Sequence, residues 1–339
     1  MNAVVEATDL HKTYGETVAL ESVSLAVDDG EVFALIGPNG AGKTTLVRAL
    51  TGTTVPNSGT AHLLDESPTA VDRSRLGVLP QEFSPPARLT AQELLEYYAG
   101  LYDESRDPET VLADVGLVEA GDTWYENLSG GQKRRVCVGS ALVNDPDVLF
   151  LDEPTTGIDP AGRRTVWRLI EDLAAGGTTV VLTTHDMAEA ERLADRVGLL
   201  ADGSLVASGT PAALVAEHGG SSRLTVEPTA ETTLDEVASS GTLSALEYAV
   251  ESRDGTLVFE DVSPADIGPI VDVLEDEGLE YTSISWAEPD LETVYLELAD
   301  GEERAQTDRR SIGVEPARAE ASTTADSTGT QEANPEGSQ

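Results

Sequence analysis

The stretch Gly37-Pro38-Asn39-Gly40-Ala41-Gly42-Lys43-Thr44-Thr45 decides the fold of this chain. It follows the apolar run Val32–Ile36, which is typical of a buried strand, and it leads into a segment with a helical pattern that continues to Leu50. A glycine loop between a strand and a helix lets backbone N–H groups and the helix dipole converge on phosphate. Lys43 adds a positive charge for the β- and γ-phosphates, and Thr44 offers a hydroxyl to Mg²⁺. We therefore expect a site for a nucleoside triphosphate.

A second apolar run, Val148–Leu151, ends in two acids, Asp152 and Glu153. A carboxylate at the end of a buried strand suits the Mg²⁺ shell, so we assign Asp152 to the metal. Glu153, one residue further, points in another direction and is the expected general base that polarises the attacking water. Such a strand is ordinary alone, and the upstream phosphate loop gives it meaning.

The pentapeptide Leu128-Ser129-Gly130-Gly131-Gln132 is a rarer motif. Ser129 is a good helix N-cap, and Gly130 and Gly131 permit close approach of the backbone to phosphate oxygens. We expect the phosphate loop of the same chain to lie across the subunit. The target of this helix is then the γ-phosphate held by a second chain.

Together, these motifs resemble the ATP-binding cassette (ABC) family of ATPases over roughly residues 1–215. The resemblance implies that two copies pair around ATP and Mg²⁺. It implies that adenine stacks on Tyr14 and that His185 is the switch residue, which contacts the γ-phosphate. It also implies that Gln81 contacts Mg²⁺ and water, and that Asp159 lies in a loop at the dimer interface. The implied catalytic residues are Lys43, Gln81, Glu153 and His185. The implied metal ligands are Thr44, Gln81 and Asp152. The implied ATP-binding residues are Tyr14, Gly37, Pro38, Asn39, Gly40, Ala41, Gly42, Lys43, Thr44 and Thr45.

The pattern of elements predicts an α/β fold: a P-loop ATPase domain at 1–219, a small α+β accessory domain at 220–299 and a disordered acidic tail at 300–339. In the first domain, we expect an antiparallel β subdomain, a parallel-sheet core and a helical insert at about 82–144. Its predicted elements are strands Val4–Leu10, Val18–Val27, Val32–Ile36, Thr60–Leu64, Leu76–Leu79, Asp147–Leu151, Thr178–Thr183, Val197–Leu200 and Ser204–Ala207, and helices Thr90–Leu101, Pro108–Val115, Gly130–Val143, Pro160–Leu173 and Asp186–Leu193. In the second domain, we expect strands Arg223–Glu227, Leu246–Glu251, Thr256–Glu260 and Tyr281–Trp286, helices Leu234–Ser239 and Ala265–Glu277, and a final element Leu291–Leu298.

The composition is strongly acidic, with 62 acids against 21 bases and a net charge of -41. This balance argues against nucleic-acid binding, which needs a basic surface. Lysine occurs only as Lys12, Lys43 and Lys133, and such lysine-poor acidic surfaces suit a salt-loaded cytoplasm. One cysteine, Cys137, fits a reducing compartment and a buried position. No apolar run approaches the length of about 18 residues that spans a bilayer, so we expect a cytosolic chain.

The segment Glu288–Leu298 looks like the end of the accessory domain that follows the cassette in ABC-2-type exporters, including the daunorubicin-resistance type. The resemblance implies ATP hydrolysis that drives a separate membrane permease, with the chain attached to the inner face of the cell membrane. The groove for the permease would be formed by residues of about 82–127 with the Gln81 loop. Two alternatives remain: an ABC-type ATPase without a transport role, and a nucleotide-gated regulatory module. Glu153 argues against the regulatory module, because a nucleotide sensor does not need a general base.

Overall fold

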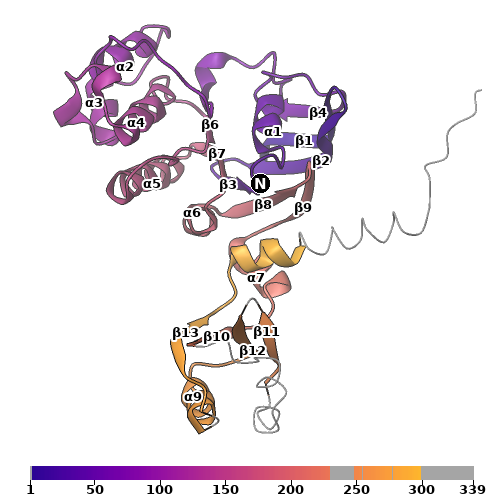
Figure 1. Ribbon diagram of the computed structural model, residues 1–339. Coiled ribbons are helices and arrows are strands. Elements are labelled where there is room, and N and C mark those ends of the chain that lie inside the picture. Colours follow the sequence, from indigo (N-terminus) through magenta and orange to yellow (C-terminus); the bar gives the residue numbers. More distant parts are fainter. Residues whose placement is uncertain (1, 230–247, 254, 277, 299–339) are drawn as a thin grey trace, which may run out of the picture. The chain divides into compact units, whose positions relative to one another are not determined.

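The computed structural model describes residues 2–229, 248–253, 255–276 and 278–298 (Figure 1). The predicted helix Leu234–Ser239 and the predicted tail at 300–339 lie outside these residues, so both stay predictions.

The central layer is a six-stranded sheet with the order β5-β6-β7-β3-β8-β9. All neighbouring pairs are parallel except β8 with β9, which confirms the predicted parallel core. Strand β3 lies between β7 and β8, so the loop that follows it opens in the middle of the sheet. The bounds are β3 (Val32–Ile36), β5 (Leu76–Leu79), β6 (Val148–Asp152), β7 (Thr179–Thr184), β8 (Arg196–Ala201) and β9 (Ser204–Gly209).

Alternate residues of the central strands enter two different cores, because successive side chains of a strand face opposite sides. Phe33 and Leu35 of β3 belong to one core with helix α1 (Lys43–Leu50) and the antiparallel sheet of β1 (Ala3–Tyr14), β2 (Thr17–Asp28) and β4 (Ser58–Leu63). Ala34 and Ile36 belong to the other core with helices α5 (Pro160–Ala175) and α6 (Met187–Leu193). The predicted antiparallel subdomain is therefore present, and it packs with α1 on the same face of the central sheet.

Helices α2 (Ala91–Ala99), α3 (Pro108–Asp114) and α4 (Gly130–Ser140) pack against one another, as the predicted helical insert requires (Figure 1). Each begins at a capped residue: Thr90 accepts from the Glu93 N–H, Asp107 from Thr110 and Ser129 from Gln132. Cys137 of α4 is buried, as predicted, and burial raises the pKa of its thiol.

A second antiparallel sheet has the order β11-β12-β10-β13 and packs on helix α9 (Ile267–Asp276). Its strands are β10 (Arg223–Pro228), β11 (Val250–Arg253), β12 (Thr256–Glu260) and β13 (Tyr281–Ala287). Three of them lie close to the predicted bounds, whereas β11 begins four residues after the predicted start at Leu246. Between the two sheets lies helix α7 (Pro211–His218), which the sequence analysis missed. The missed signal was Thr210 followed by Pro211, because Thr at the N-cap and Pro at the first helical position are a start signal.

Residues 291–298 are helical, but they do not pack into the core of the second sheet. Leu291 and Val294 are fully buried in the core that also contains Ala190 and Leu193 of α6. The expectation that this element completes the α+β unit therefore needs correction: the chain returns after β13 and packs on the cassette. The reason is that its apolar residues, three apart, form one helical stripe that α6 and its neighbours cover.

Candidate nucleotide-binding site

The phosphate loop connects β3 to α1 and depends on glycine backbone conformations. Gly42 has a φ of +106°, and a Cβ at this position would lie 2.4 Å from the carbonyl oxygen of Ala19. Only glycine tolerates both conditions without strain. Helix α1 then begins with no side-chain cap, which leaves its first N–H groups directed at a ligand.

Lys43 folds back over this loop. Its Nζ donates to the carbonyl oxygens of Gly37 at 2.7 Å and Pro38 at 3.0 Å. Burial lowers the pKa of Lys43, and the carboxylates of Glu153 and Asp152 offset part of that shift. The ammonium group is thus held beside two acids, in a position from which it can exchange its carbonyl partners for phosphate oxygens.

A cavity of about 290 Å³ brings together residues that are far apart in the sequence. Gln81 follows β5, and Glu153 follows β6; both line the cavity with the phosphate loop. Strands β5 and β6 are neighbours and β7 separates them from β3, so the cavity opens at the carboxyl ends of parallel strands, where ligands of such sheets usually bind. The lining residues are Thr17, Val18, Ala19, Asn39, Gly40, Gly42, Lys43, Thr44, Thr45, Gln81 and Glu153.

Asp152 and Glu153 are both buried at the end of β6, and Thr183 of β7 holds them differently. The Thr183 hydroxyl donates to Oδ1 of Asp152 at 2.5 Å, while the backbone N–H of Glu153 donates to the Thr183 carbonyl oxygen at 3.1 Å. Glu153 has a φ of +51°, which is uncommon for a residue with a side chain. The two neighbouring acids therefore have different hydrogen-bond partners: the side chain of Asp152 and the backbone N–H of Glu153 bond to different atoms of Thr183.

The Glu153 carboxylate has two polar neighbours. The Thr156 hydroxyl donates to Oε2 at 3.0 Å, and Nδ1 of His185 lies 3.5 Å from Oε1. The His185 side chain is 56% exposed, against 8% for Glu153, so the histidine is accessible to a ligand. Helix α6 starts directly after it: Asp186 is the N-cap and accepts from the Glu189 N–H at 3.2 Å. His185 therefore lies at the rim of the site, adjacent to the buried acid.

The residues near the triphosphate cavity offer an oxygen-rich set for Mg²⁺. Thr44 and Gln81 line the cavity, and Asp152 lies close enough to Lys43 to affect its pKa. Mg²⁺ needs only one or two protein carboxylates, since phosphates and waters complete its octahedron. Over the described ranges, no cluster of three or more His, Cys, Asp and Glu side chains could hold a metal alone. The set fits a metal that arrives with a nucleotide.

Several predicted site residues do not line this cavity: the signature residues, Asp159 and Tyr14, and also Gly37, Pro38, Ala41, Asp152 and His185. The signature residues Leu128–Gln132 lie outside it, with Ser129 and Gln132 in a reciprocal capping box that fixes the start of α4. Asp159 is the N-cap of α5 and also lies outside. Tyr14 is 47% exposed, with Nζ of Lys12 5.1 Å from its ring centroid. The signature residues therefore do not border the cavity that the phosphate loop of this chain forms.

Arg134 is a residue that the sequence analysis did not single out. Its Nη2 donates to the carbonyl oxygens of Asp152 and Glu153, the latter at 2.9 Å. Its Nη1 donates to those of Pro80 at 3.3 Å and Gln81 at 3.4 Å. One side chain of the signature helix thus contacts the loops that follow β5 and β6. The local sequence does not distinguish Arg134 from the adjacent Arg135. Only the fold shows that the two side chains have different hydrogen-bond partners.

Loop, acids and cavity define a nucleoside triphosphatase with an α/β core and a helical insert. The family model described as ABC transporter matches residues 20–156. A Nod factor export ATP-binding protein I of Paraburkholderia xenovorans is 41% identical over 226 residues, covering 64% of this chain and 74% of the relative. The same-named protein of Cupriavidus metallidurans is 35% identical over 321 residues, covering 90% of this chain and all of the relative.

Solved structures agree with this assignment. The ATP-binding subunit of an ABC transporter matches with a TM-score of 0.58 and 28% identity, over 64% of this chain and 93% of that one. A dimeric ATP-binding cassette in a post-hydrolysis state, bound to ADP and phosphate, matches with a TM-score of 0.57 and 27% identity, over 61% of this chain and 98% of that one. The chain belongs to the ABC transporter family, as an ATP-binding subunit with ATPase activity. In the part of the chain described, every helix is too short or too polar to cross a membrane.

Proposed function

We propose that this chain works as a homodimer that closes around two ATP molecules and drives an export permease. The observation that carries the proposal is the position of the signature helix: its capped N-terminus lies outside the cavity formed by the phosphate loop, Gln81 and Glu153. A helix N-terminus with two glycines favours an anion, and a second copy supplies one. Each site then consists of the phosphate loop of one copy and the signature motif of the other.

In this proposal, Lys43 neutralises the β- and γ-phosphates, and Tyr14 stacks under adenine. Mg²⁺, held by Thr44, Gln81 and Asp152, supplies charge stabilisation at the phosphates when it is bound. Glu153 accepts the proton of the attacking water, with its carboxylate fixed by the Thr156 hydroxyl at 3.0 Å.

His185 lies 3.5 Å from the Glu153 carboxylate and contacts the γ-phosphate, and Asp159 reaches across the dimer interface. We assign these contacts from the resemblance of the motifs to those of the family.

The Glu153→Gln variant tests the assignment of the general base. Glutamine has nearly the same shape, so ATP binding is retained, but it cannot accept a proton. We expect loss of steady-state ATPase activity together with an ATP-dependent dimer in size-exclusion chromatography. Unchanged hydrolysis in this variant rules out Glu153 as the base, whatever its effect on dimerisation.

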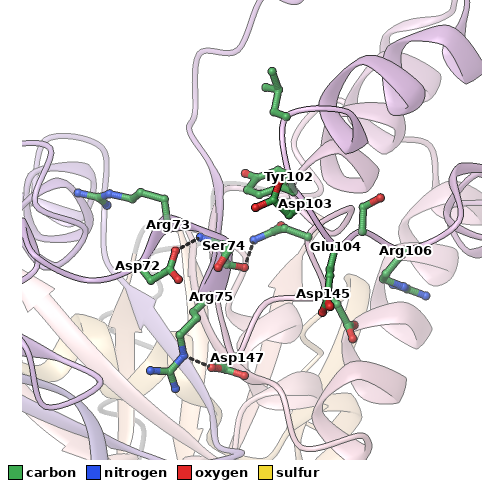
Figure 2. A pocket seen from close by; sticks show the side chains of 13 residues that line it. Asp72, Arg73, Ser74, Arg75, Tyr102, Asp103, Glu104, Arg106, Asp145 and Asp147 are labelled. Carbon is green, nitrogen blue, oxygen red and sulfur yellow. Dashed lines mark hydrogen bonds and ion pairs between the residues drawn. The ribbon is translucent and has the colours of Figure 1, made fainter.

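We propose that the permease docks in a groove between the central sheet and the helical insert. A cavity of about 880 Å³ lies there, lined by residues 72–75, 101–106, 144, 145 and 147. Figure 2 shows Asp103 and Glu104 among the residues that line this cavity, and it also shows the salt bridge of 2.5 Å between Arg75 and Asp147. Residues 101–106 of this groove belong to the predicted 82–127 surface, and the other lining residues lie at the edge of the sheet. Strand β5 (Leu76–Leu79) begins at the groove and leads toward Gln81.

The charge of this groove indicates the chemistry of its partner. Its three arginines have acceptors within the chain: Arg73 donates to the Thr51 carbonyl oxygen at 2.9 Å, Arg75 pairs with Asp147 and Arg106 with Asp114. The acids Asp103 and Glu104 are exposed, which leaves the groove acidic. We therefore propose a basic cytoplasmic loop of the permease as the occupant.

Reversal of charge tests this docking site. We expect the double variant Asp103→Lys and Glu104→Lys to lose co-purification with the permease while ATP hydrolysis by the isolated chain is unchanged. The control is Glu66→Lys, which reverses the charge of an exposed residue outside both the groove and the predicted 82–127 surface. Equal retention of the permease by both variants contradicts the proposed site.

Export, the ABC-2 type and attachment to the inner face of the cell membrane are further parts of the proposal. They are supported by relatives named as export ATP-binding proteins, one of which aligns over 90% of this chain. We also propose domain limits of 1–219, 220–299 and 300–339, and a salt-rich cytoplasm as the setting for a net charge of -41. Co-purification of a neighbouring gene product with about six apolar spans of some 20 residues would support the transport role.

A further inference from the structure

The helix at residues 291–298 makes a specific contact with helix α6. Leu291 and Val294 are fully buried in the same core as Ala190 and Leu193 of α6. The backbone N–H of Leu291 donates to Oε1 of Glu191 at 2.7 Å, and this bond satisfies one of the free donors at the helix start. An apolar stripe and a capped N-terminus thus hold the returning segment on α6.

This contact lies next to the catalytic site. Helix α6 begins at Met187, two residues after His185, with Asp186 as its N-cap. A cavity of about 470 Å³ is bordered by Gly37 and Pro38 of the phosphate loop and by His185 on one side. Glu292 and Leu296 of the returning helix border the same cavity. The segment that follows the second sheet therefore lies against the loop that presents His185.

Helix α6 depends on its neighbours for its position. It has only seven residues, and isolated helices of that length do not form in water. On one side, its Glu189 accepts hydrogen bonds from Thr155 and Trp167, both at 2.7 Å. On the opposite face, two residues further along the helix, Glu191 accepts the hydrogen bond from the Leu291 N–H. Release of that second side allows α6 to shift, and His185 shifts with it.

We propose that the helix at 291–298 is a positioning element for His185, through which the region that follows the cassette controls hydrolysis and leaves ATP binding unaffected. Leu291, Val294 and Glu191 are its positioning residues; they act through α6 and touch neither ATP nor its reacting atoms. This inference rests on the role proposed above for His185.

The first test is the double variant Leu291→Ala and Val294→Ala in the full chain. We expect kcat for ATP to fall about tenfold, since small displacements of a catalytic group cost that much or more, while KM stays within about twofold. Glu297→Gln is the matched control on the same helix, because Glu297 pairs with Arg223 and its side chain is 55% exposed. Equal kcat values for the double variant and the control overturn the inference.

The pair Glu191→Gln and Glu191→Ala covers the case in which the double variant fails to fold. The glutamine amide keeps an oxygen acceptor for the Leu291 N–H, so we expect Glu191→Gln to retain kcat and Glu191→Ala to lower it. Equal kcat losses in both variants, or none in either, contradict a role for this hydrogen bond.

The combination with His185→Ala separates this inference from the function on which it rests. If the helix acts through His185, its variants cause no further loss of kcat in the His185→Ala background. A further loss of about tenfold there shows a general structural effect and overturns the inference. Unchanged turnover in His185→Ala alone instead refutes the role of His185 itself.

Discussion

Replacement of Arg134 by methionine removes the link between the signature helix and the loops that follow β5 and β6, which we propose to be catalytic. The side chain donates to the carbonyl oxygens of Asp152 and Glu153, and at 3.3 Å and 3.4 Å to those of Pro80 and Gln81. Hydrogen bonds with a charged partner contribute about 1.5–3 kcal/mol each, so the two short bonds together represent about 3–6 kcal/mol. If about 2 kcal/mol of this is lost in the transition state because Glu153 moves, kcat falls about 30-fold.

Arg135→Met is the matched control, because the neighbouring arginine has the same chemistry in a different place. It donates to the carbonyl oxygens of Val115 at 2.8 Å and Gly116 at 2.7 Å, at the end of α3. We expect both variants to lower the free energy of unfolding, measured by denaturant titration, and only Arg134→Met to lower kcat. ATPase assays that show equal kcat losses for the two variants refute the idea that Arg134 positions Glu153.

Three further outcomes follow from the same geometry. Gly42→Ala should abolish binding of a fluorescent ATP analogue, since its Cβ would lie 2.4 Å from the Ala19 carbonyl oxygen at a φ of +106°; retained binding contradicts this account of the loop. Burial lowers the pKa of Lys43, so its positive charge is lost as pH rises through that lowered pKa. We therefore expect the affinity for ATP to decline at a less alkaline pH than it would with an exposed lysine. An affinity that stays constant up to the usual pKa range of lysine contradicts this expectation. A net charge of -41 should make the melting temperature rise between low salt and molar KCl, and a melting temperature independent of salt contradicts adaptation to a salt-rich cytoplasm.

Local sequence signals predicted most of the cassette. The strand before Gly37, the glycine pattern and Lys43 together specify a phosphate loop, and each has a physical reason that acts within a few residues. The start of α4 at Ser129 was predictable for the same reason, since the capping box with Gln132 is a local contact.

Long-range features could not be derived from such signals. The position of β3 between β7 and β8 depends on which strands pair, and no single strand encodes its partner. The roles of Arg134 and Arg135 differ only through contacts made 18 to 54 and 19 to 20 residues away, respectively. The helix at 291–298 has a clear apolar stripe, but the sequence does not say which of two cores it enters.

The most direct test of the central claim, that one copy of this chain cannot complete an ATP site, is dimerisation of Glu153→Gln with and without Ser129→Arg. Light scattering with ATP and Mg²⁺ at molar KCl measures the mass, and a fluorescent nucleotide measures binding in parallel. We predict that Glu153→Gln forms an ATP-dependent dimer and that the added arginine abolishes the dimer while each chain still binds ATP. An ATP-dependent dimer that survives Ser129→Arg contradicts the composite site.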